Sequence, residues 1–347
     1  MNQASSTSNM AGDTPTLLFE VNTRKMSLQS ALEFWQESAG SMYDVKIFQP
    51  DAFHTAHSTV RFGGLLLTHC ASVAQKLSRS SYRIGTDGYD HFTVQFFLAG
   101  QWSRQDGRRE EKAGPGDLII HDTAQTHAGA ASDFVNVTLF VPRSLLAPLL
   151  NSPDEQNMRV LAADDPMVGL LRNHVSNLWR ALPLLSERQA AALAMPTTQL
   201  VAAVLNGGSR EDTIQGVATA QLAEIRHYIQ AHIWDKDLSA GRIAMAFGIS
   251  PRKLAYLFSG WGGVMSYVQR QRLELARRAL RDPAQVHKSI ADVGLEHGFI
   301  YAHNFTRAFQ RVYGLTPREV RSMAQKSWIV GISGSHSWFD RAARWGR

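Results

Sequence analysis

The spacing of apolar residues divides this chain of 347 residues into a β-like part and a helical part. Residues 28–38 have apolar side chains at helical spacing and predict a short helix. Between about residues 44 and 142 the pattern changes to short β-branched and aromatic runs separated by Gly, Asp and Asn, which is typical of strands. From residue 166 onward the helical spacing returns. We therefore expect a β domain with flanking helices, followed by an all-α domain.

The strand-like runs are KIFQP, TVRFGGLLLTHCASV, HFTVQFFLAGQWSRQ, DLIIHD and FVNVTLFVP. Their number and spacing predict an antiparallel β-barrel or sandwich over residues 44–142, and of these two we expect the barrel. In it, Asp106 and Gly107 form the tip of a hairpin, and residues 114–117 turn the chain into the strand 118–121.

Alternation along residues 92–98 divides the side chains of this strand between two faces. We interpret the face that carries Phe92, Val94 and Phe96 as inward, where aromatic side chains could line a small-molecule cavity. For any single side chain, the alternative is a simple packed core. The predicted effector-pocket residues are Phe92, Val94, Phe96, Trp102 and His121.

Two amphipathic patterns follow the strands. Residues 166–182 carry an apolar stripe, and a second helix begins at a capping box of Ser186 and Gln189 and is interrupted by Pro196. An apolar stripe does not say what covers it, so these helices pack either on their own barrel or on a second protomer. The Gly- and charge-rich run 206–216 predicts a linker.

One helix-turn-helix pattern then appears twice, over residues 238–259 and 289–310. Each copy has a short apolar helix that begins at a serine, a turn with a glycine, and a second helix. The turn glycines are Gly248 and Gly298, which permit a positive φ. Two such units predict two DNA-reading helices on one chain.

The second copy matches a fixed pattern of approximately GFxxxxxFxRxFxxxxGxTPxxxR. The matching residues are Gly298, Phe299, Phe305, Arg307, Phe309, Gly314, Thr316, Pro317 and Arg321. On these residues the segment resembles the C-terminal domain of AraC/XylS-type transcription regulators. Gly294, His297 and Ile300 depart from the pattern. The run PGDLIIHD resembles the cupin-like sensor domain that precedes such DNA-binding domains.

The resemblance implies a two-domain α+β fold, with a sensor and dimerisation domain over residues 28–205 and a DNA-binding domain over residues 217–322. The barrel is expected over about 44–142 and the two later helices over about 166–205. We expect a disordered tail over residues 1–27 and a basic tail over residues 323–347.

In the first unit, Leu254, Leu257 and Phe258 are expected to be buried, because a recognition helix presents its other face to the major groove. The exposed, predicted DNA-binding residues of this unit are Arg252, Lys253, Ala255 and Tyr256, and the resemblance to the family implies Ala302, His303, Thr306 and Arg307 in the second unit. A bridging helix over residues 264–280 would hold the two units one DNA turn apart, roughly 34 Å. Its basic residues, Arg270, Arg272, Arg277 and Arg278, face either phosphate or solvent.

Positive charge is concentrated on the helical part. Residues 217–347 carry 19 Lys and Arg against 9 Asp and Glu, a balance of +10, whereas residues 1–216 carry 17 against 21, a balance of −4. Together with the two helix-turn-helix patterns, this charge favours contact with phosphate.

The sequence offers little for catalysis. It has no His-x-His pair of the kind found in cupin metal sites and no Gly-x-Ser-x-Gly motif. His121 and His127 are six residues apart and could approach each other only across a turn. We expect no metal, no cofactor and no enzymatic activity. Cys70 is the only cysteine, which excludes an intrachain disulfide and favours a reducing cytoplasm.

The predicted function is a sequence-specific transcription regulator, expected to activate a catabolic operon in response to a small effector, either an aromatic compound or another catabolic substrate. The resemblance implies a homodimer, promoter DNA with direct repeats and RNA polymerase as partners, and no membrane. Two alternatives remain: an N-terminal domain that only dimerises or binds a partner, and a cupin-type enzyme fused to a DNA-binding domain.

Overall fold

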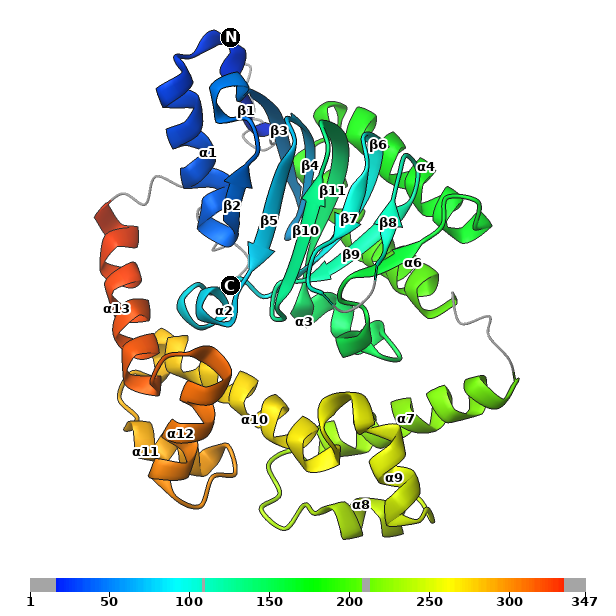
Figure 1. Ribbon diagram of the computed structural model, residues 1–347, viewed down its shortest axis with the longest axis vertical. Helices are drawn as coiled ribbons and strands as arrows, with labels where there is room; N and C mark the ends of the chain where they lie inside the picture. Colours follow the sequence, from blue (N-terminus) through cyan, green and yellow to red (C-terminus); the bar gives the residue numbers. More distant parts are fainter. Residues whose placement is uncertain (1–16, 108–109, 208–212, 334–347) are drawn as a thin grey trace, which may run out of the picture.

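The computed structural model describes residues 17–107, 110–207 and 213–333 (Figure 1). Its N-terminal domain contains two antiparallel sheets. The larger has the strand order β1-β3-β4-β11-β6-β9-β12, and the smaller has the order β2-β5-β10-β7-β8. The strands are β1 (Leu17–Asn22), β2 (Asp44–Ile47), β3 (Thr55–Phe62), β4 (Leu65–Ser72), β5 (Gln75–Arg79), β6 (His91–Ala99), β7 (Trp102–Arg104), β8 (Lys112–Ala113), β9 (Leu118–Asp122), β10 (His127–Ala131), β11 (Phe134–Pro142) and β12 (Arg159–Leu161).

The expected closed barrel is wrong, because the strands form two separate sheets. The outer strands of the larger sheet are β1 and β12, and those of the smaller sheet are β2 and β8. The alternation of apolar and polar residues and the turn residues are the same in a barrel and in two stacked sheets. Whether a sheet closes into a barrel depends on pairing between strands that are distant in the sequence. The local pattern therefore predicts the strands but not how they close.

The first strand and helix lie partly inside the segment that was expected to be disordered. β1 pairs with β3, and the 3-10 helix Thr23–Lys25 follows it, so the predicted tail is wrong over Leu17–Lys25. The expected helix from residue 28 is present as α1 (Leu28–Met42), with the Ser27 side chain capping its first turn. Residues 1–16 lie outside the described residues.

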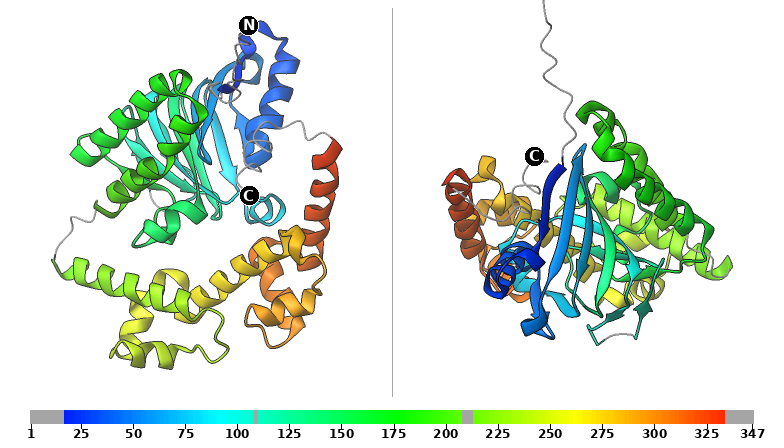
Figure 2. Two further views of the ribbon diagram at one scale, coloured as in Figure 1. Left: turned by 180° about the vertical axis from the view of Figure 1, so that it is seen from behind. Right: turned by 90° about the horizontal axis from the view of Figure 1, so that it is seen from above.

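Helices cover one face of the larger sheet, as Figure 2 shows from above. These are α4 (Pro166–Ala181), α5 (Glu187–Ala192) and α6 (Ala194–Gly207), and the capping box of Ser186 and Gln189 is formed. Their apolar stripes share a buried core with the sheet, so both patterns pack on their own domain. The run Glu187–Gly207 is long and apolar enough to cross a membrane, but Val201 and Val204 lie in this core and Leu193 separates α5 from α6.

The C-terminal domain is all helical. Its helices are α7 (Thr213–Ala231), α8 (Ala240–Ala246), α9 (Pro251–Leu257), α10 (Val264–Arg281), α11 (Ile290–Glu296), α12 (Ala302–Tyr313) and α13 (Pro317–Ser333). One core gathers residues of α7 to α10, and a second gathers residues of α10 to α13. The expected linker includes residues 208–212, outside the described residues, while α6 and α7 occupy its two ends. The boundary expected after residue 322 falls inside α13.

Two short helices of the N-terminal domain lie toward the C-terminal domain. They are α2 (Ser81–Thr86), between β5 and β6, and α3 (Arg143–Leu146), directly after β11. In Figure 1 both lie at the edge of the sheets that faces α10 and α12.

Candidate DNA interface and ligand cavity

The first helix pair, α8 and α9, is built from local signals in the sequence. Ser239 caps α8, Gly248 adopts a φ of 59° in the turn, and Ser250 caps α9 ahead of Pro251. Leu254 is buried against the domain core. The four residues predicted to face DNA are all exposed: Arg252, Lys253, Ala255 and Tyr256.

The apolar side of α9 was predicted almost correctly. Phe258, just after the helix, is buried as expected, whereas Leu257 is only half-buried. Tyr256 keeps 75 % of its surface exposed although it is a large aromatic residue. Its ring lies at the surface, on the same helix as the basic residues Arg252 and Lys253, and is free to contact a molecule that binds this side of α9.

The second helix pair, α11 and α12, repeats this construction. Ser289 and Asp292 form a capping box at the start of α11, and Gly298 turns the chain with a φ of 80°. Phe305 and Phe309 are fully buried on the inner side of α12. The outer side carries the predicted DNA-binding residues: Ala302, His303 and Arg307 are exposed and Thr306 is half-buried.

Two of the departures from the family pattern have a structural explanation. A Cβ atom on Gly294 would lie 2.9 Å from Cδ1 of Phe305, so the missing side chain lets α11 approach α12 closely. His297 is buried, its Nδ1 lies 2.7 Å from the Val293 carbonyl, and burial lowers its pKa. Ile300 is 71 % exposed at the start of the outer surface.

Two arginines of the bridging helix α10 do not face phosphate or solvent, contrary to expectation. Arg272 is buried, and its guanidinium donates to the carbonyls of Ile233 and Asp235 at 2.9 and 2.6 Å. Arg277 is 1 % exposed and donates to the Ile84 carbonyl at 2.9 Å. Arginines this deeply placed are held by backbone oxygens and serve the packing of the domain.

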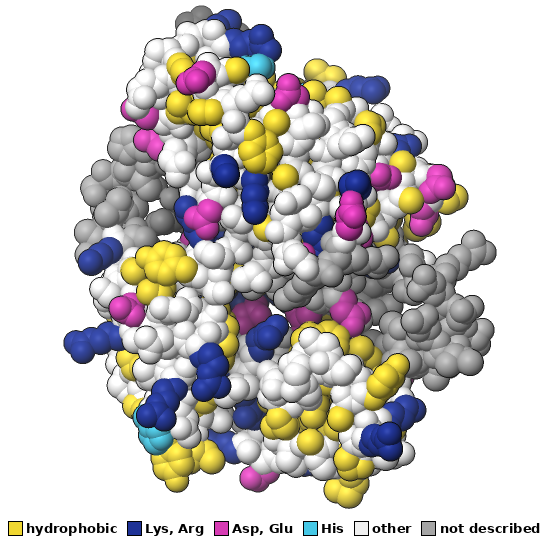
Figure 3. All heavy atoms as spheres, viewed as in Figure 1, with side chains coloured by type: hydrophobic (Ala, Val, Ile, Leu, Met, Phe, Trp, Pro, Cys, Tyr) yellow, Lys and Arg dark blue, Asp and Glu magenta, His cyan; other side chains and the backbone are white. Residues whose placement is uncertain are grey.

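The other two arginines of α10 remain at the surface. Arg278 pairs with Glu274 at 2.6 Å and with Asp90 of the N-terminal domain at 3.2 Å. Arg270 is exposed. Figure 3 shows Lys and Arg side chains spread over the lower part of the molecule, which the C-terminal helices form. Of the predicted basic face of α10, Arg270 is therefore the residue best placed for phosphate.

Ionic contacts join α10 to the N-terminal domain. Arg143 of α3 is buried and pairs with both Asp122 and Asp154. The Asp154 carboxylate also accepts the Tyr267 hydroxyl at 2.9 Å and the Gln271 amide at 3.0 Å. A cleft of about 440 Å³ lies beside these groups. Carboxylate oxygens of one domain thus hold polar side chains of the DNA-binding domain's central helix.

A second contact between the domains is apolar. Ile84 of α2 is 4 % exposed and lies in the core of the second helix pair, with Leu273, Phe309 and Val320. The surrounding backbone is hydrogen-bonded to α10, since Arg281 donates to the Thr86 carbonyl. A residue of the N-terminal domain therefore completes the core of the C-terminal one.

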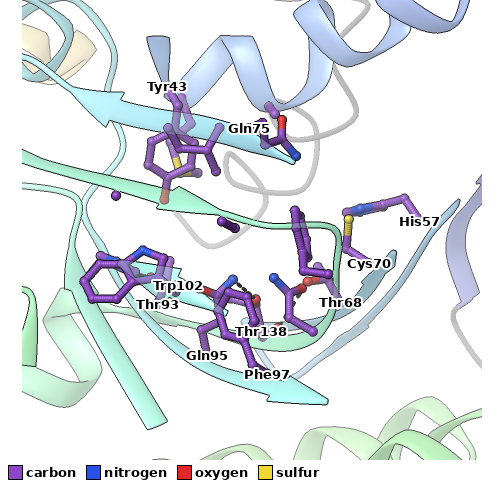
Figure 4. Close-up of a pocket in the computed structure, with 18 of the residues that line it drawn as sticks. Tyr43, His57, Thr68, Cys70, Gln75, Thr93, Gln95, Phe97, Trp102 and Thr138 are labelled. Carbon is purple, nitrogen blue, oxygen red and sulfur yellow. Dashed lines mark hydrogen bonds between the residues drawn. The ribbon is translucent and has the colours of Figure 1, made fainter. Parts of the chain in front are cut away.

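A cavity of about 110 Å³ lies between the two sheets and α1 (Figure 4). In Figure 4, Tyr43 and Gln75 lie on one side of it, and Gln95, Phe97 and Thr138 on the other. Trp102 and His121 line it as expected. The lining residues that the sequence interpretation missed include Trp35, Tyr43, His57, Cys70, Gln75, Thr93, Gln95, Phe97, His127 and Phe134.

The assignment of Phe92, Val94 and Phe96 to this cavity is wrong. They point to the other face of β6 and pack with the helices that cover the larger sheet. Thr93 and Gln95, which lie between them, and Phe97, which follows them, face the cavity. Alternation separated the two sets correctly, but both faces of β6 are buried, so apolar character could not show which one faces the cavity.

Two histidines meet in the cavity wall, across the turn between β9 and β10. The ring centroids of His121 and His127 are 4.9 Å apart. Burial lowers the pKa of His121 to about 4, and burial with the neighbouring His121 and Arg79 lowers that of His127 well below its ordinary value. Both rings are therefore neutral at pH 7. Among the described residues, no three His, Cys, Asp or Glu side chains are grouped as a metal ion requires.

Comparison with known proteins gives two matches in chain order. An AraC-binding-like domain matches residues 41–206, and a helix-turn-helix domain matches residues 243–323. The chain belongs to the AraC/XylS-type transcription regulators. It is a DNA-binding regulator, as the helix-turn-helix match and the curated relatives agree.

Two relatives of this regulator are named as activators. The transcriptional activator NphR of Rhodococcus sp is 24 % identical over 88 % of this chain and 92 % of its own length. The XylDLEGF operon transcriptional activator 1 of Pseudomonas putida is 22 % identical over 68 % of this chain and 76 % of its own. The crystal structure of the AraC-like transcriptional activator CuxR has the same fold, with a TM-score of 0.52 and 23 % identity over 74 % of this chain and 94 % of that one.

Proposed function

We propose that this regulator is an effector-responsive activator in which α9 and α12 read two successive major grooves of promoter DNA. The observation that carries this function is the exposure of seven of the eight predicted residues, on two helices that are bridged by one helix, α10. Thr306 is half-buried and the other seven are exposed, while the apolar sides of both helices are packed. A helix in the major groove requires this division of its surface.

The side chains on α9 and α12 fit base recognition. Arg252 lies at the start of α9, and a bidentate contact between arginine and guanine contributes about 1–3 kcal/mol of discrimination. On α12, His303 and Arg307 occupy the same outer side. Direct-repeat sites, spaced by about one DNA turn, are the promoter sequences that such an arrangement suits.

The ligand-sensing part is assigned to the cavity between the sheets. Its wall is mostly apolar and aromatic, with a few polar groups, which is the usual composition of a small-molecule site. Met42 lines the cavity, and its carbonyl accepts a hydrogen bond from Arg79, 2.7 Å away. Arg79 is ion-paired with Asp87 beside α2, the helix that carries Ile84 into the DNA-binding domain. A ligand can change the domain arrangement only if it binds one arrangement more tightly.

The same proposal includes activation of a catabolic operon and contact with RNA polymerase. It also includes pairing of two protomers and a cytoplasmic location. The two relatives that are named as activators support activation. The alternative of a domain that only dimerises or binds a partner is disfavoured by the cavity. A fused enzyme finds no support in these two relatives, which are both named as activators.

A genome-wide footprint with and without candidate growth substrates tests this function. We expect discrete sites with direct repeats beside a catabolic operon, and transcription that changes with one substrate. Arg252→Ala should reduce occupancy at those sites, whereas Arg311→Ala, an exposed change at the far end of α12, should leave the pattern intact. Binding to no discrete site, or equal effects of both variants, would count against the assigned reading helices.

A further inference from the structure

We propose that the cavity binds an uncharged, single-ring aromatic molecule with a hydrogen-bond donor and an acceptor, and excludes carboxylates and ammonium ions of the same size. This ligand class rests on the effector-sensing function proposed above and gives it a chemistry. Three properties of the wall lead to it: its charge, the unsatisfied polar atoms of Gln75 and His127, and its size.

The wall offers no partner for a charged ligand. Among the described residues, none of the side chains that line the cavity is a Lys, Arg, Asp or Glu. The nearest guanidiniums are already engaged, Arg79 by Asp87 and the Thr123 carbonyl, and Arg104 by Asp106 and Glu111. An ion transferred from water into such a site loses its hydration without an opposite charge in return, which is strongly unfavourable.

The histidines of the wall do not supply a positive charge either. Burial lowers the pKa of both His57 and His121 to about 4, and His127 also lies well below its ordinary pKa. A carboxylate would have to raise one of these pKa values before it found a cation. A neutral ligand meets no such cost.

The buried polar atoms of the wall without a hydrogen-bond partner among the described residues include two that face each other's strand. One is Nε2 of Gln75, an amide donor, because the Gln75 Oε1 already accepts the Trp35 indole N–H at 2.8 Å. The other is Nε2 of His127. The His127 Nδ1 lies 3.1 Å from the Gln125 carbonyl, which can only accept, so in the neutral ring Nε2 is the acceptor. The cavity therefore presents one donor and one acceptor.

These two atoms lie on neighbouring strands with their side chains on the same face. Gln75 of β5 is opposite Ala131 of β10, and His127 is opposite Arg79. Four residues of strand separate the two positions, roughly 13 Å between their Cα atoms. One substituted ring fits between two side chains of this length. A buried donor and acceptor without partners are costly, so a ligand that satisfies both gains affinity.

The size and the shape of the cavity select a single ring. A volume of about 110 Å³ lies below the ~150 Å³ of a cavity that is known to hold benzene, so the size sets an upper limit of one ring. Trp35, Phe97, Trp102 and Phe134 supply aromatic surfaces. Trp102 lies directly over Gly129, where a Cβ atom would be 2.1 Å from the indole Nε1, so a side chain at 129 would displace this wall.

Calorimetry on the full chain at pH 7.5 tests the ligand class with three isosteric probes: benzamide, benzoate and benzylammonium. We expect benzamide to bind at least about tenfold more tightly than either ion, a difference of about 1.4 kcal/mol. Ala39→Phe, which places a ring in the cavity from α1, should abolish benzamide binding and shows which site is occupied.

Substitutions of the two polar atoms refine the test. Gln75→Leu and His127→Phe should each weaken benzamide binding and leave toluene binding unchanged. His174→Phe is the matched control, because His174 lies on α4, where it contacts Thr197 away from the cavity. If a wall variant does not fold, the three probes on the unaltered chain decide alone.

Equal or tighter binding of benzoate or benzylammonium, sensitive to Ala39→Phe, would overturn the ligand class and leave the sensing function standing. Failure of all three probes to bind would overturn it as well, and would remove the cavity from the proposed function. The DNA footprint, made without any probe, reports separately on the reading helices.

Discussion

Truncation of Ile84 should loosen the two domains from each other. Ile84 belongs to the N-terminal domain, but its side chain is 4 % exposed in the core of the second helix pair. Ile84→Ala removes the apolar atoms that hold α2 in that core. It leaves the hydrogen bond from Arg277 to the Ile84 backbone carbonyl in place.

The magnitude follows from the burial of this side chain. Truncation of a fully buried isoleucine to alanine costs about 2–5 kcal/mol. The lower end applies here, because two domains can separate slightly and admit water, so the vacated space is not left empty. A loss of about 2 kcal/mol reduces the equilibrium constant for docking roughly 30-fold. If docking transmits the signal, the same variant should bind DNA with much weaker dependence on effector.

The assay is a distance measurement between paired labels in the two domains. Leu184 is 85 % exposed in the N-terminal domain and Arg311 is exposed on α12, so cysteines at both positions can be labelled. The native Cys70 is buried and its pKa is raised to about 12, so it should not compete. The matched control is Tyr82→Ala on the same helix, since Tyr82 is 53 % exposed.

We expect a second, longer distance in Ile84→Ala and a single distance in Tyr82→Ala. Identical distance distributions in the two variants would refute the reasoning, because they would show that the buried isoleucine does not hold the domains together. A general loss of helicity in Ile84→Ala is a different result, and circular dichroism of the same samples detects it.

Three further predictions concern stability and reactivity. Gly298→Ala should lower the free energy of unfolding in urea more than Gly314→Ala does. Both glycines have a positive φ, but only at position 298 would a Cβ atom meet Arg272, at 2.7 Å. Equal losses of unfolding free energy in the two variants would contradict this. Stability should fall as the pH drops from about 6.5 toward 4, since the unfolded chain binds protons that the buried His121, with a pKa of about 4, does not, and His121→Asn should flatten this dependence in pH-scanned unfolding. The Cys70 thiol should react with a thiol reagent in urea but not in the native protein, and rapid native labelling would show that its burial is overestimated.

Local signals in the sequence predicted the helical domain well. Ser239 and Ser289 cap the first helices of the two copies, as expected, and Gly248 and Gly298 take up positive φ in the two turns. Each of these features depends on residues three or four positions apart, so the sequence contains all the information needed. The exposed sides of α9 and α12 follow from the same periodicity.

The errors concern contacts between distant segments. The strands were predicted, but their closure into a barrel was not correct, because closure requires pairing of strands far apart in the chain. The predicted cavity face of β6 was the wrong one, since helices more than sixty residues later bury the face of Phe92. Arg272 and Arg277 were treated as surface residues, although both are buried and donate to backbone carbonyls of distant segments, Ile233 and Ile84.

The route from the cavity to the DNA-reading helices depends on these distant contacts. Met42 lines the cavity, its carbonyl is bonded to Arg79, and Arg79 is paired with Asp87 beside α2. The next contact is that of Ile84 with the core of the second helix pair. Only four residues of the N-terminal domain therefore separate a ligand from α10 and α12. Contiguity alone does not produce coupling, which requires that the ligand and the docked arrangement favour the same position of α2. A probe that binds the cavity and leaves the interdomain distance of the unaltered chain unchanged would show that this route is structural and carries no signal.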